Sequence, residues 1–269
     1  MPYSRKIFSL ACFFIALTVL VNGCATHEPE HATNSNASHG EKAHWGYEGA
    51  EGPEAWGKLK PEFAPCSEGK SQSPIDIADA SAQDLANIAF SYQPASLDIV
   101  NNGHTIQVNY AEGSSIEVDG ATYALKQFHF HGPSEHTMKG KHSPLEIHLV
   151  HQNASGGLAV VGVMIDSGSG NQALAPVWAN LPSESGQERK LEDVKINATD
   201  ILPDEHLYYR YDGSLTTPPC SEGVKWFVLT KAIEASDEQV AAFNAIIKGN
   251  NRPVQPLNRR EVRLDSTPK

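Results

Sequence analysis

Two short histidine-bearing segments place the strongest constraint on how this chain can fold. They cover residues 127–131, with the sequence QFHFH, and residues 145–151, with the sequence LEIHLVH. Their apolar and aromatic residues favour β-strands, on which successive side chains point to opposite faces. His129 and His131 therefore share one face of the first strand, and we expect His148 on the second strand to face the same space.

Three imidazoles that converge from two strands form a predicted metal site. We expect His129, His131 and His148 to bind Zn²⁺, because three neutral imidazoles leave the fourth tetrahedral position open, as in catalytic rather than structural zinc sites. Gln127 and Glu146 lie on the same faces as these histidines. They are the predicted acceptors for the second ring nitrogens.

Short strand patterns dominate the rest of the chain. Alternating or β-branched stretches, separated by Gly, Pro and Asn, also predict strands near residues 96–100, 105–110, 115–118 and 158–165. Helical patterns are limited to residues 172–180 and to residues 237–247, which begin after Ser236. His151 points away from the other strand histidines and is interpreted as structural. No repeat or linker interrupts residues 45–269, so we predict a single, mainly β domain.

The N-terminus has the pattern of a secretory signal over residues 1–23. Arg5 and Lys6 precede an apolar run from Ile7 to Val21 that is short for a membrane span. The run ends in LVNGC, which is similar to a bacterial lipoprotein cleavage box, so lipidation of Cys24 is the favoured prediction. Ordinary signal cleavage and an uncleaved anchor stay open. Each of the three exports the domain to the periplasm or outer cell envelope.

Residues 24–43 are rich in His, Glu, Ser, Asn, Thr and Ala, a composition typical of a flexible tether. Its histidines, His27, His31 and His39, are interpreted as part of a solvated linker, with weak metal scavenging as the alternative. The formal net charge of −11 disfavours nucleic acid as a partner.

Two of the four cysteines, Cys66 and Cys220, lie in the predicted domain at residues 44–266. In an oxidising compartment they most simply form one disulfide. Two unrelated free thiols are the alternative.

Over about residues 44–264 the chain resembles the alpha-type carbonic anhydrases. The resemblance includes both histidine strands and further segments in the family's order: HWGY at 44–47, QSPIDI at 72–77, NGH at 102–104, SEHT at 134–137, GSLTTPPC at 213–220 and RPVQPL at 252–257. It implies an α+β, mainly β fold: one domain around a large, twisted, mostly antiparallel sheet with a few short surface helices. The zinc would lie at the base of a conical cleft.

The resemblance also implies an activity, the reversible hydration of carbon dioxide to bicarbonate and a proton by a zinc-bound hydroxide. Thr216 resembles the residue that accepts the proton of that hydroxide, and Glu135 the carboxylate that accepts the proton of the threonine. Thr217 is expected to bind bicarbonate or ordered water. An apolar wall would hold carbon dioxide; its residues are Val150, Val160, Leu215 and Trp226.

Two further expectations concern His104 and the cysteines. His104 resembles the family's proton shuttle and titrates in the required range. A Cys66–Cys220 bridge would tie the N-terminal part of the domain to the loop that carries Thr216.

Two other functions remain as alternatives. One is a non-catalytic relative that keeps the fold as a binding module, but the three histidines, Thr216 and Glu135 are all present. The other is a zinc-binding lipoprotein that uses the histidines of the tether. A homodimer is allowed but not required by the sequence.

Overall fold

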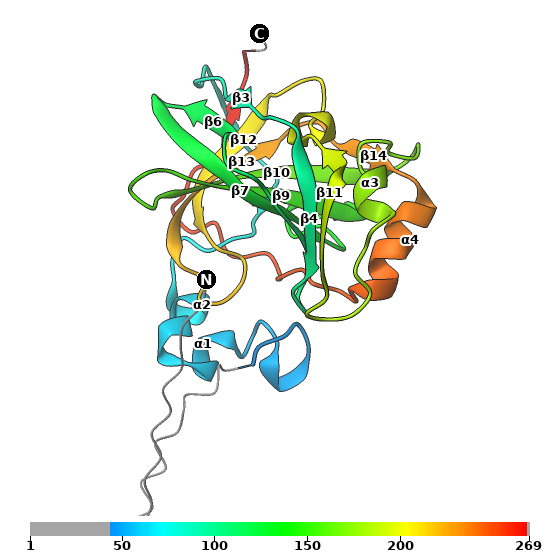
Figure 1. Ribbon diagram of the computed structural model, residues 1–269. Coiled ribbons are helices and arrows are strands. Elements are labelled where there is room, and N and C mark those ends of the chain that lie inside the picture. Colours follow the sequence, from blue (N-terminus) through cyan, green and yellow to red (C-terminus); the bar gives the residue numbers. More distant parts are fainter. Residues whose placement is uncertain (1–43, 268–269) are drawn as a thin grey trace, which may run out of the picture. The chain divides into compact units, whose positions relative to one another are not determined.

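A twisted sheet of 13 strands forms the centre of the protein, and a separate two-stranded sheet pairs β1 with β8 (Figure 1). The computed structural model describes residues 44–267. The strands are β1 (Asp76–Ile77), β2 (Ser81–Gln83), β3 (Ala89–Ser91), β4 (Ala95–Asn101), β5 (Ile106–Asn109), β6 (Ser115–Val118), β7 (Ala121–His131), β8 (Thr137–Met138), β9 (Leu145–Gln152), β10 (Leu158–Ser167), β11 (Glu188–Ile196), β12 (Tyr208–Ser214), β13 (Glu222–Leu229), β14 (Ile233–Ala235) and β15 (Arg263–Asp265).

The order along the large sheet is β11-β4-β5-β7-β9-β10-β13-β12-β15-β2, with β3, β6 and β14 attached beside this path. Most neighbours are antiparallel, and the parallel pairs in this sheet are β10 with β13, β10 with β14, and β15 with β2. The single, mainly β domain expected from the sequence is therefore confirmed. The predicted segments 1–23 and 24–43, including Cys24, lie outside the described residues.

The two histidine strands are direct neighbours. β7 and β9 are antiparallel, and His129 lies opposite His148, so both side chains point to the same face. The register shifts between Leu125 and Gln127. This bulge places an extra residue in β7, so Leu125 turns to the hydrophobic core while Gln127 turns to the histidine face. The alternation pattern therefore holds only from residue 127 onward.

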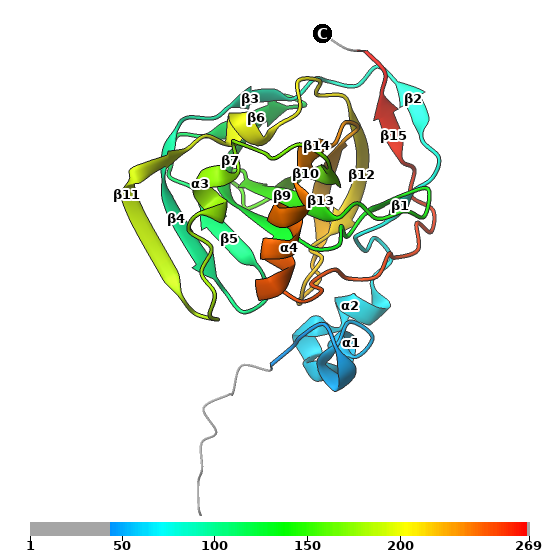
Figure 2. The same ribbon diagram turned by 90° about the vertical axis from the view of Figure 1, so that its right-hand side faces the viewer.

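The helices are α1 (Trp56–Leu59), α2 (Pro65–Glu68), α3 (Ala175–Trp178) and α4 (Asp237–Ile246), and the 3-10 helices are η1 (Gly49–Glu51), η2 (Pro61–Phe63) and η3 (Ala198–Ile201). Helices α3 and α4 cover the sheet face opposite the three histidines, whereas α1 and α2 lie apart from that face, in a small separate cluster around Trp56 and Cys66. In Figure 2, α4 lies across the sheet next to α3. Phe130 of β7 packs against Trp178 and Phe243, one from each helix. The main core therefore lies between these helices and the sheet.

Two helices were predicted, and both are present with different bounds. α4 begins after Ser236, whose hydroxyl accepts a hydrogen bond from the Gln239 amide in a capping box. α3 is shorter than the predicted 172–180, because Pro176 near its start cannot donate a backbone hydrogen bond. Among residues 44–267, no helix is long and apolar enough to cross a membrane.

Candidate metal centre

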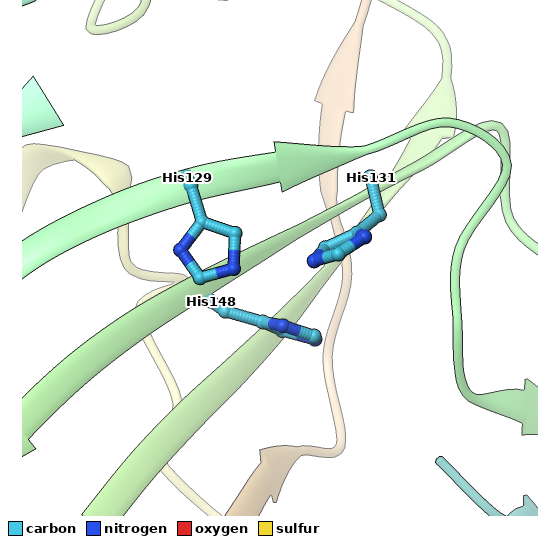
Figure 3. Close-up of side chains that lie close together, drawn as sticks. All are labelled: His129, His131 and His148. Carbon is cyan, nitrogen blue, oxygen red and sulfur yellow. The ribbon is translucent and has the colours of Figure 1, made fainter. Parts of the chain in front are cut away.

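Three imidazoles converge on the open face of the central strands. His129 and His131 come from β7 and His148 comes from β9, and their rings turn toward one space (Figure 3). One nitrogen from each ring lies within 4.8 Å of the others. This spacing approaches that of nitrogens around a tetrahedral ion with bonds of about 2.0–2.1 Å.

The second nitrogen of each ring is held by an acceptor. Nδ1 of His129 lies 2.8 Å from Oε1 of Gln127, and Nε2 of His148 lies 2.9 Å from Oε1 of Glu146. Nδ1 of His131 lies 2.7 Å from the carbonyl oxygen of Asn250. Because carbonyl and carboxylate oxygens only accept, each of these nitrogens donates.

The nitrogens that remain are therefore unprotonated: Nε2 of His129, Nε2 of His131 and Nδ1 of His148. Nε2 of His131 is buried and has no hydrogen-bond partner. A buried acceptor without a partner is costly unless a ligand occupies the space before it. The donor set thus fits Zn²⁺, which binds neutral imidazoles.

Burial keeps the three rings neutral. It lowers the pKa of His131 to about 4. With help from the neighbouring histidines, it also lowers the pKa of His129 well below its ordinary value. Burial also lowers the pKa of His148. Neutral imidazoles are the form that binds a metal, so the site is ready without the loss of a proton.

The carboxylate of Glu146 accepts four hydrogen bonds and thereby fixes the orientation of His148. Oε1 accepts from His148 and from Nδ1 of His136, at 2.7 Å, and Oε2 accepts from the backbone amides of Glu135 and His136. Burial raises the pKa of Glu146, but the two histidines outweigh it and hold that pKa well below its usual range. A Cβ on Gly162 would lie 3.0 Å from Oε1, so glycine on β10 leaves room for this carboxylate.

The same network extends to residues that sequence reasoning did not assign. Nε2 of His136 lies 2.7 Å from the Tyr211 hydroxyl, which donates to the hydroxyl of Ser73. His136 therefore has both nitrogens occupied. It stands in the SEHT segment noted in the sequence, but only the fold connects it to Glu146.

Glu135 is buried beside the free imidazole nitrogens. Its Oε2 lies 3.5 Å from Nε2 of His131 and 3.8 Å from Nδ1 of His148, and its Oε1 accepts from the Arg252 backbone amide. Burial raises the pKa of Glu135 to about 7, against the opposing effects of His148, the Arg252 amide and the Thr216 hydroxyl. Thr216 therefore lies beside Glu135, whose buried Oε2 has no hydrogen-bond partner.

An apolar cluster borders the histidines. Val150, Val160 and Trp226 are in register across β9, β10 and β13, and the Trp226 ring lies 4.8 Å from that of His148, measured between centroids. Val150 and Leu215 are half-buried and pack against this cluster. The four residues of the predicted wall therefore lie together on the histidine side of the sheet.

His104 and Thr217 line one cavity with two of the converging histidines. This cavity, of about 130 Å³, is bordered by His104, Thr217, His129 and His131 among other residues. The His104 ring stacks on Trp45 with centroids 3.7 Å apart. Burial and the nearby His44 lower the pKa of His104, so the neutral form prevails at neutral pH.

The predicted disulfide is confirmed: Cys66 and Cys220 are bonded with an S–S distance of 2.08 Å. The bridge closes a loop between residues 154 positions apart, which stabilises a protein by about 3–5 kcal/mol in the chain-entropy model. The backbone amide of Cys220 donates to the Thr217 carbonyl at 2.8 Å. The bridge therefore secures the loop that carries Thr216 and Thr217.

The comparisons with known proteins agree with this geometry. A family model described as "Eukaryotic-type carbonic anhydrase" matches residues 51–266. The chain is 45% identical to a carbonic anhydrase of Pectobacterium atrosepticum over 84% of this chain and 93% of that protein, and 46% identical to one of Neisseria gonorrhoeae over 85% and 90%. The solved alpha-carbonic anhydrase of Thermovibrio ammonificans, in complex with the inhibitor sulfanilamide, superposes with a TM-score of 0.81 at 49% identity, covering 83% of this chain and all of that one. The chain thus belongs to the alpha-type carbonic anhydrase family.

Proposed function

We propose that this protein catalyses the reversible hydration of carbon dioxide to bicarbonate with Zn²⁺ held by His129, His131 and His148. The observation that carries the proposal is the convergence of three unprotonated ring nitrogens, each on a ring whose other nitrogen is held by an acceptor. When bound, zinc lowers the pKa of water to about 7 in carbonic anhydrases, so that a hydroxide nucleophile is available at neutral pH.

Thr216 and Glu135 would orient the nucleophile. A threonine hydroxyl can donate one hydrogen bond, and the buried Glu135 carboxylate next to it would accept that bond. The Thr216 oxygen would then be free to accept a hydrogen bond from the nucleophile, whose lone pair would point at carbon. Thr217 borders the cavity that His129 and His131 also line, and it would hold the bicarbonate product or an ordered water there.

Carbon dioxide is apolar, so its site should be apolar as well. Val150, Val160, Leu215 and Trp226 supply such a surface beside His148. We assign these four side chains to carbon dioxide binding. Their placement next to the histidines would bring the substrate carbon close to the nucleophile without a charged group that holds the product back.

His104 would carry the released proton to solvent. It borders the cavity that contains His129 and His131, and its lowered pKa keeps it neutral and able to accept a proton at pH 7. The stack on Trp45 fixes one position of its ring. A neutral imidazole that is half-buried at a cavity wall suits repeated protonation and release.

Residues 1–43 are the basis for a proposal about where the enzyme is located. We propose that residues 1–23 export the domain to the periplasm or outer cell envelope and that Cys24 carries a lipid, with 24–43 as a tether. The Cys66–Cys220 bridge supports an oxidising compartment. Labelling with a radioactive or clickable fatty acid in wild type and Cys24→Ser tests the lipid directly.

Stopped-flow hydration of carbon dioxide tests the proposed activity. We expect fast hydration by the zinc-loaded protein and a loss of this activity in a chelator that removes zinc. A non-catalytic binding module would give no hydration in either condition. A zinc-storage lipoprotein would bind several zinc ions without hydration activity.

A further inference from the structure

Arg252 is a buried cation that the proposed mechanism leaves without a role. Its side chain is 1% exposed, and within residues 44–267 no carboxylate forms an ion pair with its guanidinium. The guanidinium lies 5.7 Å from the centroid of the Trp56 ring instead. A buried charge without an ion-pair contact is costly, even though the more distant Glu135 favours its charged form, so an apolar residue would fill this position more cheaply if packing were its only role.

The guanidinium makes hydrogen bonds to three neutral groups. Nη1 donates to Oε1 of Gln72 and to the carbonyl of Ser73, and Nη2 donates to the carbonyl of Cys66, all at 2.8 Å. The planar fork of an arginine suits several acceptors at once. Arg252 therefore joins the segment before β1 to one end of the disulfide.

Gln72 carries this connection to the loop of Thr216. Its Nε2 donates to the carbonyl of Cys220 at 3.0 Å, and the Cys220 amide donates to the Thr217 carbonyl at 2.8 Å. Cys220 is also bonded to Cys66. The guanidinium thus reaches the threonine loop by two routes, through Gln72 and through the disulfide.

The backbone of Arg252 contacts Glu135, the residue that faces the Thr216 loop in the proposed mechanism. Its amide donates to Oε1 of Glu135 at 2.8 Å. Oε2 has no hydrogen-bond partner and lies 3.5 Å from Nε2 of His131. One residue therefore connects to Glu135 with its main chain and to the Thr216 loop with its side chain.

We propose that the Arg252 side chain is a positioning residue for hydration, which holds the Thr216 loop at a fixed position relative to Glu135. The inference rests on the roles of Thr216 and Glu135 in the proposed function. Without the guanidinium, the loop keeps its disulfide but loses the bonds that fix its distance from the Glu135 carboxylate. The threonine hydroxyl then points to its acceptor in a smaller fraction of molecules.

Arg252→Met tests this role, because it keeps the backbone amide and most of the side-chain length but removes the guanidinium. We expect kcat/KM for hydration to fall about tenfold at full zinc content, since small displacements of orienting groups have large effects on rate. In dilute buffer, where proton release through His104 limits turnover, kcat should fall less than kcat/KM, because that step does not involve Arg252 or the Thr216 loop. Arg252→Lys keeps the charge and one donor and should recover part of kcat/KM.

Arg260→Met is the matched control. Arg260 also donates only to carbonyl groups, those of Leu257, Pro256 and Asp212, and its guanidinium lies 5.6 Å from the centroid of the Tyr211 ring. Its hydrogen bonds do not reach Glu135 or the disulfide. We expect this variant to lower thermal stability but to keep kcat/KM within twofold of wild type.

A double-mutant cycle with Glu135→Gln completes the test. If Arg252 acts through Glu135, Arg252→Met should cause little further loss of kcat/KM in the Glu135→Gln background. Additive losses, an unchanged kcat/KM in Arg252→Met, or an equal loss in Arg260→Met would each overturn the inference. An unchanged rate in Glu135→Gln itself would instead contradict the proposed role of Glu135. If Arg252→Met does not fold, Arg252→Lys takes its place in the cycle.

Discussion

The two histidines of β9 lie on opposite faces of the strand and differ in whether a ring nitrogen is left free to bind metal. His148 points to the open face, where Glu146 holds one of its nitrogens and the other nitrogen faces His129 and His131. His151, three residues later, points into the core, where Nε2 meets the Tyr92 hydroxyl at 2.8 Å and Nδ1 lies 3.3 Å from the Ala159 carbonyl. Both rings are buried and neutral. Burial alone therefore does not identify a ligand; a nitrogen left without a protein partner does.

Removing one histidine from each face of β9 tests directly whether only the His148 face binds zinc. We expect His148→Ala to lose zinc and to lower hydration activity by about a thousandfold or more, because no side chain replaces a metal-activated nucleophile. His151→Gln should keep one zinc per chain and nearly full activity at 25 °C. Zinc analysis by mass spectrometry together with stopped-flow rates measures both. Zinc loss in His151→Gln would contradict the assignment.

Thr216→Val tests the role of the threonine hydroxyl beside the three histidines. Valine keeps the shape of threonine but cannot accept a hydrogen bond from the nucleophile, so kcat/KM should fall about a hundredfold with zinc retained. Val150→Ala, a change in the apolar wall on the same side, should have a smaller effect. Equal rates for Thr216→Val and wild type would remove Thr216 from the mechanism.

His104→Ala tests the proton path at the border of the cavity. We expect unchanged zinc content and kcat/KM, with kcat about tenfold lower or more in dilute buffer. Imidazole buffer at increasing concentration should restore kcat, because it replaces the missing acceptor. Equal turnover in both proteins at all buffer concentrations would exclude His104 as the shuttle.

His151 should make the core face sensitive to acid. Burial lowers its pKa to about 3, so its stabilising contribution is complete above pH 6.5 and declines as the pH falls toward 3. The difference in unfolding free energy between wild type and His151→Gln, both saturated with zinc, should be about 2 kcal/mol smaller at pH 5 than at pH 7. Urea unfolding at the two pH values measures it. Tyr92→Phe, which keeps the histidine, should retain the pH dependence of wild type.

The alternation of side chains on strands was enough to bring the right histidines together. It placed His129, His131 and His148 on one face, and it separated His151 from them, because these rules depend only on neighbours along the chain. The family resemblance supplied the mostly antiparallel sheet, and the cysteine count supplied the pairing of Cys66 with Cys220. Both agree with the structure.

Contacts between distant segments could not be predicted in the same way. The acceptor for His131 is a backbone carbonyl at Asn250, 119 residues away, and any residue type can supply a carbonyl. The bond between Arg252 and Cys66 spans 186 residues. The bulge before Gln127 also leaves no clear mark in the sequence, so the strand was predicted only from Gln127, whereas it begins at Ala121.

The central claim is that one zinc ion, held by the three histidines of the open face, makes this protein a carbonic anhydrase. The direct test is stopped-flow hydration of carbon dioxide by protein stripped of metal and titrated with Zn²⁺. We predict no activity above background in the stripped protein and a linear rise that ends at one equivalent of zinc per chain. Full activity in the stripped protein, or no activity at one equivalent of bound zinc, would contradict this account.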